Sequence, residues 1–269
     1  MHYSKVKRAK IDRCSICGEE KSLSWDHVPP KGSLELTPVE METIFQVFTG
    51  DRENRKVRES QNGVKYRTLC NECNSTLGLH YDPSIKEFAE SVGRYLNSDL
   101  AFPEVVGHRT KPNAIMRGIL GHLLAANADF GETTFDVDVR EFLFDHSAPI
   151  PHGIYIHYWL YPYSQIVVMR DFCMPSVRGK FSSKPGFFHT LKYFPIAYLV
   201  SNLRQYENLY ELTQYRHIDV EEEVDLPIRL NRVEHQFWPE IVDDGNMLFG
   251  GQSMASSVSA NPRLRKPLK

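Results

Sequence analysis

The sequence predicts an α+β protein in which a small N-terminal module precedes a larger α+β domain with an antiparallel sheet. Three observations support this fold class. Two C-x-x-C pairs lie in the first third of the chain. Helical spacing of apolar residues recurs between residues 82 and 145, and runs of β-branched and aromatic residues follow from Gly153. We therefore expect a module at residues 1–98, a domain at 99–250 and a disordered tail at 251–269.

The composition is that of a soluble globular protein, since 41% of the 269 residues are hydrophobic and 25% are charged. No apolar run reaches the roughly 18 residues that a transmembrane helix needs. The basic N-terminus lacks the apolar core of a signal peptide, so we expect a cytoplasmic protein without a membrane partner. The formal net charge of −2 neither indicates nor excludes nucleic-acid binding, which depends on local clusters of charge.

The N-terminal module is expected to contain a hairpin, a helix and a strand before its second cysteine pair. Residues 11–31 combine the first pair with a short strand that Pro29 and Pro30 end, since proline cannot donate to a sheet. Residues 37–48 carry a threonine, a proline and apolar spacing of three and four, which predicts a short helix. A polar loop is expected at 50–63, then a strand at 64–69 and a helix after the second pair.

Three further helices and a set of strands are expected in the rest of the chain. Residues 82–97 begin with Asp and Pro and place apolar residues on one face. Residues 99–112 look like a linker, and amphipathic spacing predicts helices over 111–129 and 135–145. From Gly153, four apolar and aromatic runs indicate antiparallel strands of one sheet. The histidines within apolar patterns are predicted to be buried core residues rather than ligands; they are His122, His157 and His189.

Two C-x-x-C pairs in a reducing compartment indicate metal binding rather than disulfides. The pairs are Cys14 with Cys17 and Cys70 with Cys73. Each pair lies in a tight turn that directs both sulfurs the same way, so two turns can complete a tetrahedral zinc site. Four thiolate ligands leave no open position, which predicts a structural Zn²⁺ rather than a catalytic one. The long segment between Cys17 and Cys70 exceeds a simple zinc ribbon and indicates an insertion.

A second group of polar residues lies close to the cysteine pairs in the sequence. Asp26 and His27 are at the end of a short strand, and Asn74 directly follows Cys73. In a regular strand Asp26 and His27 face opposite sides, but the two prolines that follow bend the chain and could bring both side chains to one pocket. Histidine is the natural general base near neutral pH, and a carboxylate with an amide oxygen suits a hard cation. Metal-assisted phosphodiester hydrolysis needs these groups.

The order C-x-x-C, Asp-His and Leu-Cys-x-x-Cys-Asn before a helix resembles the HNH endonucleases, in the zinc-bearing subgroup typified by phage endonuclease VII. The resemblance covers roughly residues 11–90 and implies a ββα-metal, or treble-clef, finger. It implies that His27 is the general base, that Asp26 and Asn74 hold Mg²⁺ or Mn²⁺, and that the four cysteines hold structural zinc. The implied substrate is nucleic acid, with DNA expected, and the implied cleavage leaves 5′-phosphate and 3′-hydroxyl ends.

The sequence departs from the family pattern in the segment before the second cysteine pair. Many family members have an asparagine five residues before the first cysteine of that pair, where this chain has Lys65. Asn62 could take its place, and His80 could add a metal ligand. Lys31 and Arg67 are candidates for phosphate contacts, although single surface charges are more often simply solvated.

Two functions of different classes remain open from the sequence. The first is a metal-dependent endonuclease, with residues 99–250 selecting substrate, forming a homodimer or binding a protein partner. The second is a non-catalytic zinc finger that binds nucleic acid or protein, with Asn74 as a helix N-cap and His27 as a surface residue. A thiol redox protein is disfavoured, because neither C-x-x-C pair lies in a βαβ context. Analogy with stand-alone HNH proteins suggests restriction or phage defence as the role.

Overall fold

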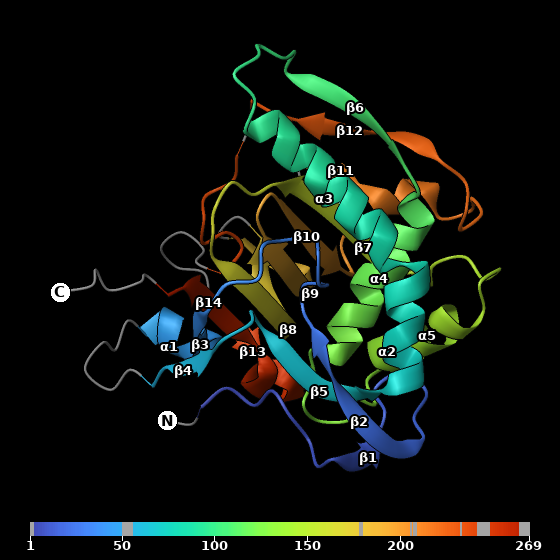
Figure 1. Ribbon diagram of the computed structural model, residues 1–269, viewed down its shortest axis with the longest axis vertical. Helices are drawn as coiled ribbons and strands as arrows, with labels where there is room; N and C mark the ends of the chain where they lie inside the picture. Colours follow the sequence, from blue (N-terminus) through green and yellow to red (C-terminus); the bar gives the residue numbers. More distant parts are fainter. Residues whose placement is uncertain are drawn as a thin grey trace.

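The protein is a mixed α+β molecule whose strands pair in antiparallel sheets (Figure 1). The computed structural model describes residues 3–49, 56–177, 180–204, 206, 209–231, 233–240 and 248–263. Within these ranges the strands form a three-stranded sheet, a nine-stranded sheet and a two-stranded ribbon. No helix in the described ranges is both long enough and apolar enough to cross a membrane.

The three-stranded sheet comes from the N-terminal third of the chain and has the strand order β1-β2-β5. Its strands are β1 (Ile11–Arg13), β2 (Glu20–His27) and β5 (Lys65–Cys70). Two helices follow directly, α2 (Asn71–His80) and α3 (Asp82–Leu96). A proline in the first turn helps to start α3, because its missing N–H is one that a helix start leaves unpaired.

The nine-stranded sheet has the order β11-β7-β10-β9-β8-β14-β3-β4, with β13 paired to β8 beside this path. Its strands are β3 (Val39–Thr43), β4 (Arg58–Ser60), β7 (Tyr155–Leu160), β8 (Ile166–Val177), β9 (Lys180–Tyr193), β10 (Ile196–Ser201), β11 (Tyr210–Glu211), β13 (Phe249–Gly250) and β14 (Val258–Pro262). The predicted antiparallel sheet after Gly153 is thus confirmed. The ribbon pairs β6 (Val105–Thr110) with β12 (Val224–Arg229). The remaining helices are α1 (Ile44–Thr49), α4 (Pro112–Ala125), α5 (Thr134–Phe144), η1 (Leu212–Tyr215) and η2 (Gln252–Ser256).

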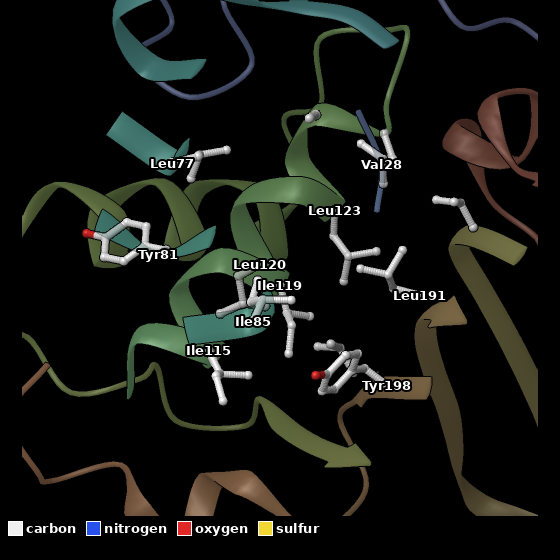
Figure 2. Close-up of a cluster of buried hydrophobic side chains, with 14 of the residues drawn as sticks. Val28, Leu77, Tyr81, Ile85, Ile115, Ile119, Leu120, Leu123, Leu191 and Tyr198 are labelled. Carbon is white, nitrogen blue, oxygen red and sulfur yellow. The ribbon is translucent and has the colours of Figure 1, made fainter. Parts of the chain in front are cut away.

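Helix α4 lies at the centre of the hydrophobic core, and all of its residues are buried. Figure 2 shows α4 side chains such as Ile119 between those of the N-terminal helices and those of the sheet. Two glycines of α4 allow the N-terminal helices to approach closely. A Cβ on Gly118 would lie 2.4 Å from Ile85 of α3, and one on Gly121 would lie 2.5 Å from Leu77 of α2. Helix α4 therefore joins the cysteine-bearing region to the large sheet.

Three predicted elements differ from the structure because strand pairing overrides the local pattern. Residues 37–48 were expected to be a helix, but β3 occupies 39–43 between β14 and β4, and only the following residues are helical. The expected loop at 50–63 contains β4, while its residues 50–55 lie outside the described residues. The expected linker at 99–112 contains β6. The predicted helices over 82–97, 111–129 and 135–145 correspond to α3, α4 and α5.

The prediction of a disordered tail is wrong for residues 252–262, which form η2 and β14. This segment has few apolar residues, but its serines are buried and hydrogen-bonded. Ser256 Oγ accepts from the Ala128 N–H at 2.9 Å, and Ser257 Oγ accepts from the Arg170 N–H at 2.8 Å. Residues 264–269 lie outside the described residues. The boundary predicted at 98/99 crosses one continuous hydrophobic core.

Candidate functional site

Four cysteine sulfurs converge where the first hairpin meets the start of α2. The Sγ atoms of Cys14, Cys17, Cys70 and Cys73 all lie within 4.8 Å of one another. The first pair lies in the turn between β1 and β2, Cys70 ends β5, and Cys73 lies in the first turn of α2. This cluster could hold a metal ion such as zinc, and the described residues contain no second such cluster of His, Cys, Asp or Glu side chains.

Main-chain geometry sets the directions of these sulfurs. The first turn closes with Gly18 at φ +72°, a left-handed conformation that glycine adopts without strain. Its N–H donates to the Cys14 carbonyl at 2.9 Å. In the second turn Cys70 is the N-cap of α2, and its Sγ accepts from the Cys73 N–H at 3.5 Å. The Cys70 N–H donates in turn to Cys14 Sγ at 3.3 Å, so the two turns order each other.

The chemistry of the four sulfurs fits a divalent cation. A hydrogen bond with the Cys73 thiol lowers the pKa of Cys14 to about 4, and the same bond raises the pKa of Cys73. Burial raises the pKa of Cys17 to about 11. Four thiolates this close together repel one another unless a cation lies between them. The cluster could therefore hold a cation with a preference for sulfur, as Zn²⁺ has.

Asn74 does not cap helix α2, because Cys70 occupies the N-cap position. The alternative in which Asn74 is the N-cap is therefore wrong. Its Nδ2 donates to the Ser24 hydroxyl and to the Trp25 carbonyl of β2, both at 3.1 Å. These bonds fix Asn74 beside the strand segment that continues into Asp26 and His27. Asn74 Oδ1 accepts no hydrogen bond within the described residues, so it remains available to a ligand.

Strands β2 and β5 present their side chains on two faces. Trp25 pairs with Arg67 and His27 pairs with Lys65 across the strands. Side chains alternate along a strand, so these two pairs lie on one face and Asp26 lies on the other. Asp26 is 5% exposed, whereas Trp25 is 42% exposed. Asp26 and His27 therefore leave the strand on opposite faces.

The outer edge of strand β2, on the side away from β5, is only partly paired. β1 pairs only with residues 20–22 of β2, so the later part of this edge is not covered by β1. The Trp25 carbonyl that accepts from Asn74 belongs to this later part. Asp26 and His27 follow it on the two faces of the strand end. A ligand bound at this edge could contact groups from both faces.

A buried histidine connects Asp26 to helix α3. His122 Nδ1 lies 3.1 Å from Asp26 Oδ2, and its Nε2 lies 2.7 Å from Asp82 Oδ1. Burial lowers the pKa of His122, but the carboxylates of Asp82 and Asp26 outweigh this effect and raise it to about 10. The imidazolium holds the Asp26 carboxylate in place through one oxygen. Asp26 Oδ1 accepts no hydrogen bond in the described part of the chain, and the three groups together carry one net negative charge.

His27 has the properties of a neutral imidazole with an available nitrogen. Burial lowers its pKa, and the positive charges of Lys65 and Lys31 lower it further. Its Nε2 is buried and has no hydrogen-bond partner among the described residues. The main chain of Asn62 lies near the ring and opposes part of this lowering of the pKa. His27 can therefore accept a proton near pH 7.

Two of the other candidate residues, Lys31 and Asn62, lie near His27, whereas Arg67 and His80 have other neighbours. Lys31 is exposed and close enough to His27 to affect its pKa. Arg67 Nη2 donates to the Arg8 carbonyl at 2.7 Å, and its guanidinium lies 5.5 Å from the centre of the Trp25 ring. His80 lies at the far end of α2, with its ring 6.2 Å from that of His146. Asn62 contributes its main chain to the site of His27.

Sequence analysis did not predict that His122 binds the candidate site residue Asp26 through one ring nitrogen and Asp82 through the other. His122 was expected to be a buried core histidine, and it is buried, but its two partners could not be read from its apolar surroundings. One indication was present in the sequence: if Asp26 is buried, its carboxylate needs a charged or hydrogen-bonding partner. Comparisons of the chain with protein families, curated proteins and solved structures find no match.

Proposed function

We propose that the protein is an HNH-type, metal-dependent endonuclease that hydrolyses phosphodiester bonds, with DNA as its substrate. In this proposal the cysteine-bearing turn, the paired strands β2 and β5 and helix α2 form a treble-clef finger, and the four-cysteine cluster holds a structural Zn²⁺. A role in restriction or phage defence stays a prediction. In this proposal, described residues supply a chemical group for each role that the reaction needs.

His27 is the proposed general base. Its Nε2 takes a proton from the water whose oxygen attacks phosphorus, and the bond from phosphorus to the 3′ oxygen breaks. Asp26 Oδ1 and Asn74 Oδ1 are the proposed ligands of Mg²⁺ or Mn²⁺, which suit hard oxygen donors. When bound, such a cation stabilises negative charge on the phosphate and the leaving oxygen. His122 and Asp82 position Asp26 without touching the substrate.

One observation carries this proposal, namely the pair of hydrogen bonds from Asn74 to Ser24 and Trp25. A helix asparagine has no need to reach into a neighbouring strand if it only follows a structural cysteine. Here its amide nitrogen binds the strand just before Asp26 and His27, and its amide oxygen accepts no hydrogen bond from the described residues. This combination of groups matches the donor set of a hydrolytic metal site.

Plasmid cleavage tests the proposal. Zinc-loaded full-length protein is incubated with supercoiled DNA and Mg²⁺ or Mn²⁺, beside the variants His27→Ala and His217→Ala. His217 is exposed and serves as the matched control. We expect nicked or linear DNA, stopped by EDTA, and a loss of at least about 100-fold in rate for His27→Ala. Equal rates for both variants, or no cleavage by the wild type with DNA or RNA, would rule out the proposed reaction.

A second candidate function is binding of nucleic acid without cleavage. The observation that favours it is the partly exposed Trp25 on the same strand face as Arg67 and Lys65, because an aromatic ring among cations suits a stacked base and its phosphate. In this case DNA affinity falls with salt concentration and with Trp25→Ala, while plasmid stays intact with every divalent cation. Cleavage with the expected His27 dependence excludes a purely binding role.

A further inference from the structure

A cavity of about 490 Å³ lies between the start of helix α5 and strands β8, β9 and β10. Elsewhere on α5, Arg140 donates a hydrogen bond to the Ser15 carbonyl in the turn that holds the first cysteine pair. Ligand sites in proteins span about 300–1,000 Å³, so this cavity can hold a small organic molecule. The residues that decide its chemistry are Phe135 and Asp138 of α5, Asp171 of β8, and Phe187 and His189 of β9. None of them belongs to the proposed nuclease site.

The tautomer of His189 is fixed by the main chain. The Asp171 N–H donates to His189 Nδ1 at 3.0 Å. A neutral imidazole that accepts at Nδ1 carries its proton on Nε2, so Nε2 is a donor. Burial, followed by the charge of Arg170, holds the pKa of His189 well below its usual value, which keeps the ring neutral. The cavity thus contains one directed hydrogen-bond donor.

Asp171 has a conformation that non-glycine residues rarely adopt, with φ at 62°. Such strained residues persist where the surroundings hold them, and they are common at ligand sites. Here the Asp171 carbonyl accepts from the Gly251 N–H at 2.7 Å. A Cβ at position 251 would lie 2.0 Å from Asp171 Oδ2, so the glycine leaves space for this carboxylate. The positioning of Asp171 therefore depends on three separate segments of the chain.

The wall behind His189 is rigid. Its ring stacks on Phe135 with 4.1 Å between ring centroids and 26° between planes. Arg170 lies over the Phe135 ring at 5.3 Å and binds Asp136 at 2.6 Å, and both charged side chains are 1% exposed. Thr133 and Asp136 form the capping box that starts α5. These contacts hold the cavity in shape without a ligand.

The carboxylates that line the cavity disfavour an anion. Asp138 and Asp171 are both carboxylates, and none of the described residues that line this cavity is a lysine or an arginine. Asp138 is half-buried, lines the cavity and forms no ion pair or side-chain hydrogen bond with another described residue. The cavity therefore favours a neutral or cationic ligand with hydrogen-bond donors, and it repels phosphate groups.

The remaining feature is an aromatic surface. Phe187 lines the cavity, is 50% exposed and forms no ring pair with another described aromatic residue. A flat ring could stack on it, with donors toward the carboxylates and an acceptor toward His189 Nε2. We infer that the cavity binds an amino-bearing nucleobase, as the free base or the nucleoside, rather than a nucleotide. Adenine, cytosine and guanine carry an amino donor beside ring acceptors, whereas thymine and uracil lack the amino group.

Calorimetric titration of the full-length protein tests this inference. The ligands are adenosine, cytidine, guanosine and uridine, each beside its 5′-monophosphate. We expect at least one amino-bearing nucleoside to bind with Kd below about 1 mM, and its monophosphate to bind at least about tenfold more weakly. No binding by any nucleoside, a preference for uridine, or tighter binding of the monophosphate would each overturn the inference.

Two tryptophan variants of helix α5 locate the binding. Thr134 is exposed and lines the cavity, while Val137 is exposed on the same helix and does not line it. Thr134→Trp should abolish nucleoside binding, and Val137→Trp should retain it, with equal thermal unfolding of the two variants as the check on folding. Asp138→Asn should weaken binding at least about tenfold. Undiminished binding by Thr134→Trp would place the nucleoside elsewhere and contradict the assignment.

Discussion

The buried charges of the cysteine-bearing region and of the sheet region differ in the atoms that they leave free. In the first region His122 binds one oxygen of Asp26 and one of Asp82, so the other oxygen of Asp26 has no hydrogen-bond partner among the described residues. In the second region Asp136 binds Arg170 through one oxygen and Thr133 through the other, so its carboxylate is fully used. Buried charge alone therefore does not distinguish a ligand site from a structural ion pair, whereas a spare hydrogen-bonding atom is what the proposed metal site requires.

The largest expected effect concerns the four cysteines. Removal of zinc by a chelator, or Cys70→Ser, should lower the melting temperature by more than about 10 °C, because structural zinc contributes several kcal/mol or more to folding. Cys173→Ser is the control, since Cys173 lies outside the cluster. Hydrogen exchange should rise more in β2 and α2 than in β7 and β10. An equal rise in both regions would remove the distinction between them.

The next effect concerns the closed ion pair of the sheet region. Asp136→Asn should destabilise the protein by about 3–5 kcal/mol, because it leaves Arg170 buried with an unbalanced charge. Urea unfolding measures this loss. The matched control is Glu223→Gln, which breaks the exposed pair with Arg109 and should change stability little. Similar losses of stability in the two variants would show that the buried pair contributes no more to stability than the exposed pair.

A smaller effect concerns how the stability of the sheet region depends on pH. The pKa of His189 is lowered on folding, so the unfolded chain takes up the proton first as the pH falls. Its contribution to stability is therefore lost below the usual pKa of 6.5. Between pH 7.5 and pH 5.5 the wild type should lose about 1.4 kcal/mol more than His189→Gln, whose amide oxygen can still accept from Asp171. Parallel urea titrations that show no difference would contradict the assignment of a neutral His189.

The smallest effect tests the bond between α2 and β2. Asn74→Ala should cost about 1 kcal/mol, since it removes two hydrogen bonds that cross from helix to strand. Asn71→Ala is a control in the same helix, at an exposed position. Loss of cleavage by Asn74→Ala far beyond this loss of stability supports a role in catalysis. If cleavage is unchanged, Asn74 is a structural residue.

The sequence predicted the regular parts of the fold and the cysteine cluster. Amphipathic spacing located α3, α4 and α5, and four cysteines in two C-x-x-C pairs lie together as their spacing indicates. These features depend on neighbours in the sequence. The helix expected at 37–48 and the tail expected at 251–269 are strands in part, because β14 and β3 pair across more than two hundred residues. A local pattern carries no information about such a pairing.

The candidate site was predictable only in its residue types. Asp26, His27 and Asn74 could be named from their positions beside the cysteines, and Asn74 does reach β2. The contact between Asp26 and His122 depends on the packing of α4 against the hairpin, which the sequence does not specify. The same holds for the cavity at His189, whose residues come from separate strands and a helix.

The central claim is that Asp26 and Asn74 hold a hard cation beside His27. Electron paramagnetic resonance of Mn²⁺ titrated into zinc-loaded protein tests it most directly, because free Mn²⁺ gives a distinct signal. We expect a single Mn²⁺ site in the wild type and in His27→Ala, and loss of that site in Asp26→Asn. A wild type that leaves all Mn²⁺ free, or an Asp26→Asn variant that binds Mn²⁺ as the wild type does, would contradict it.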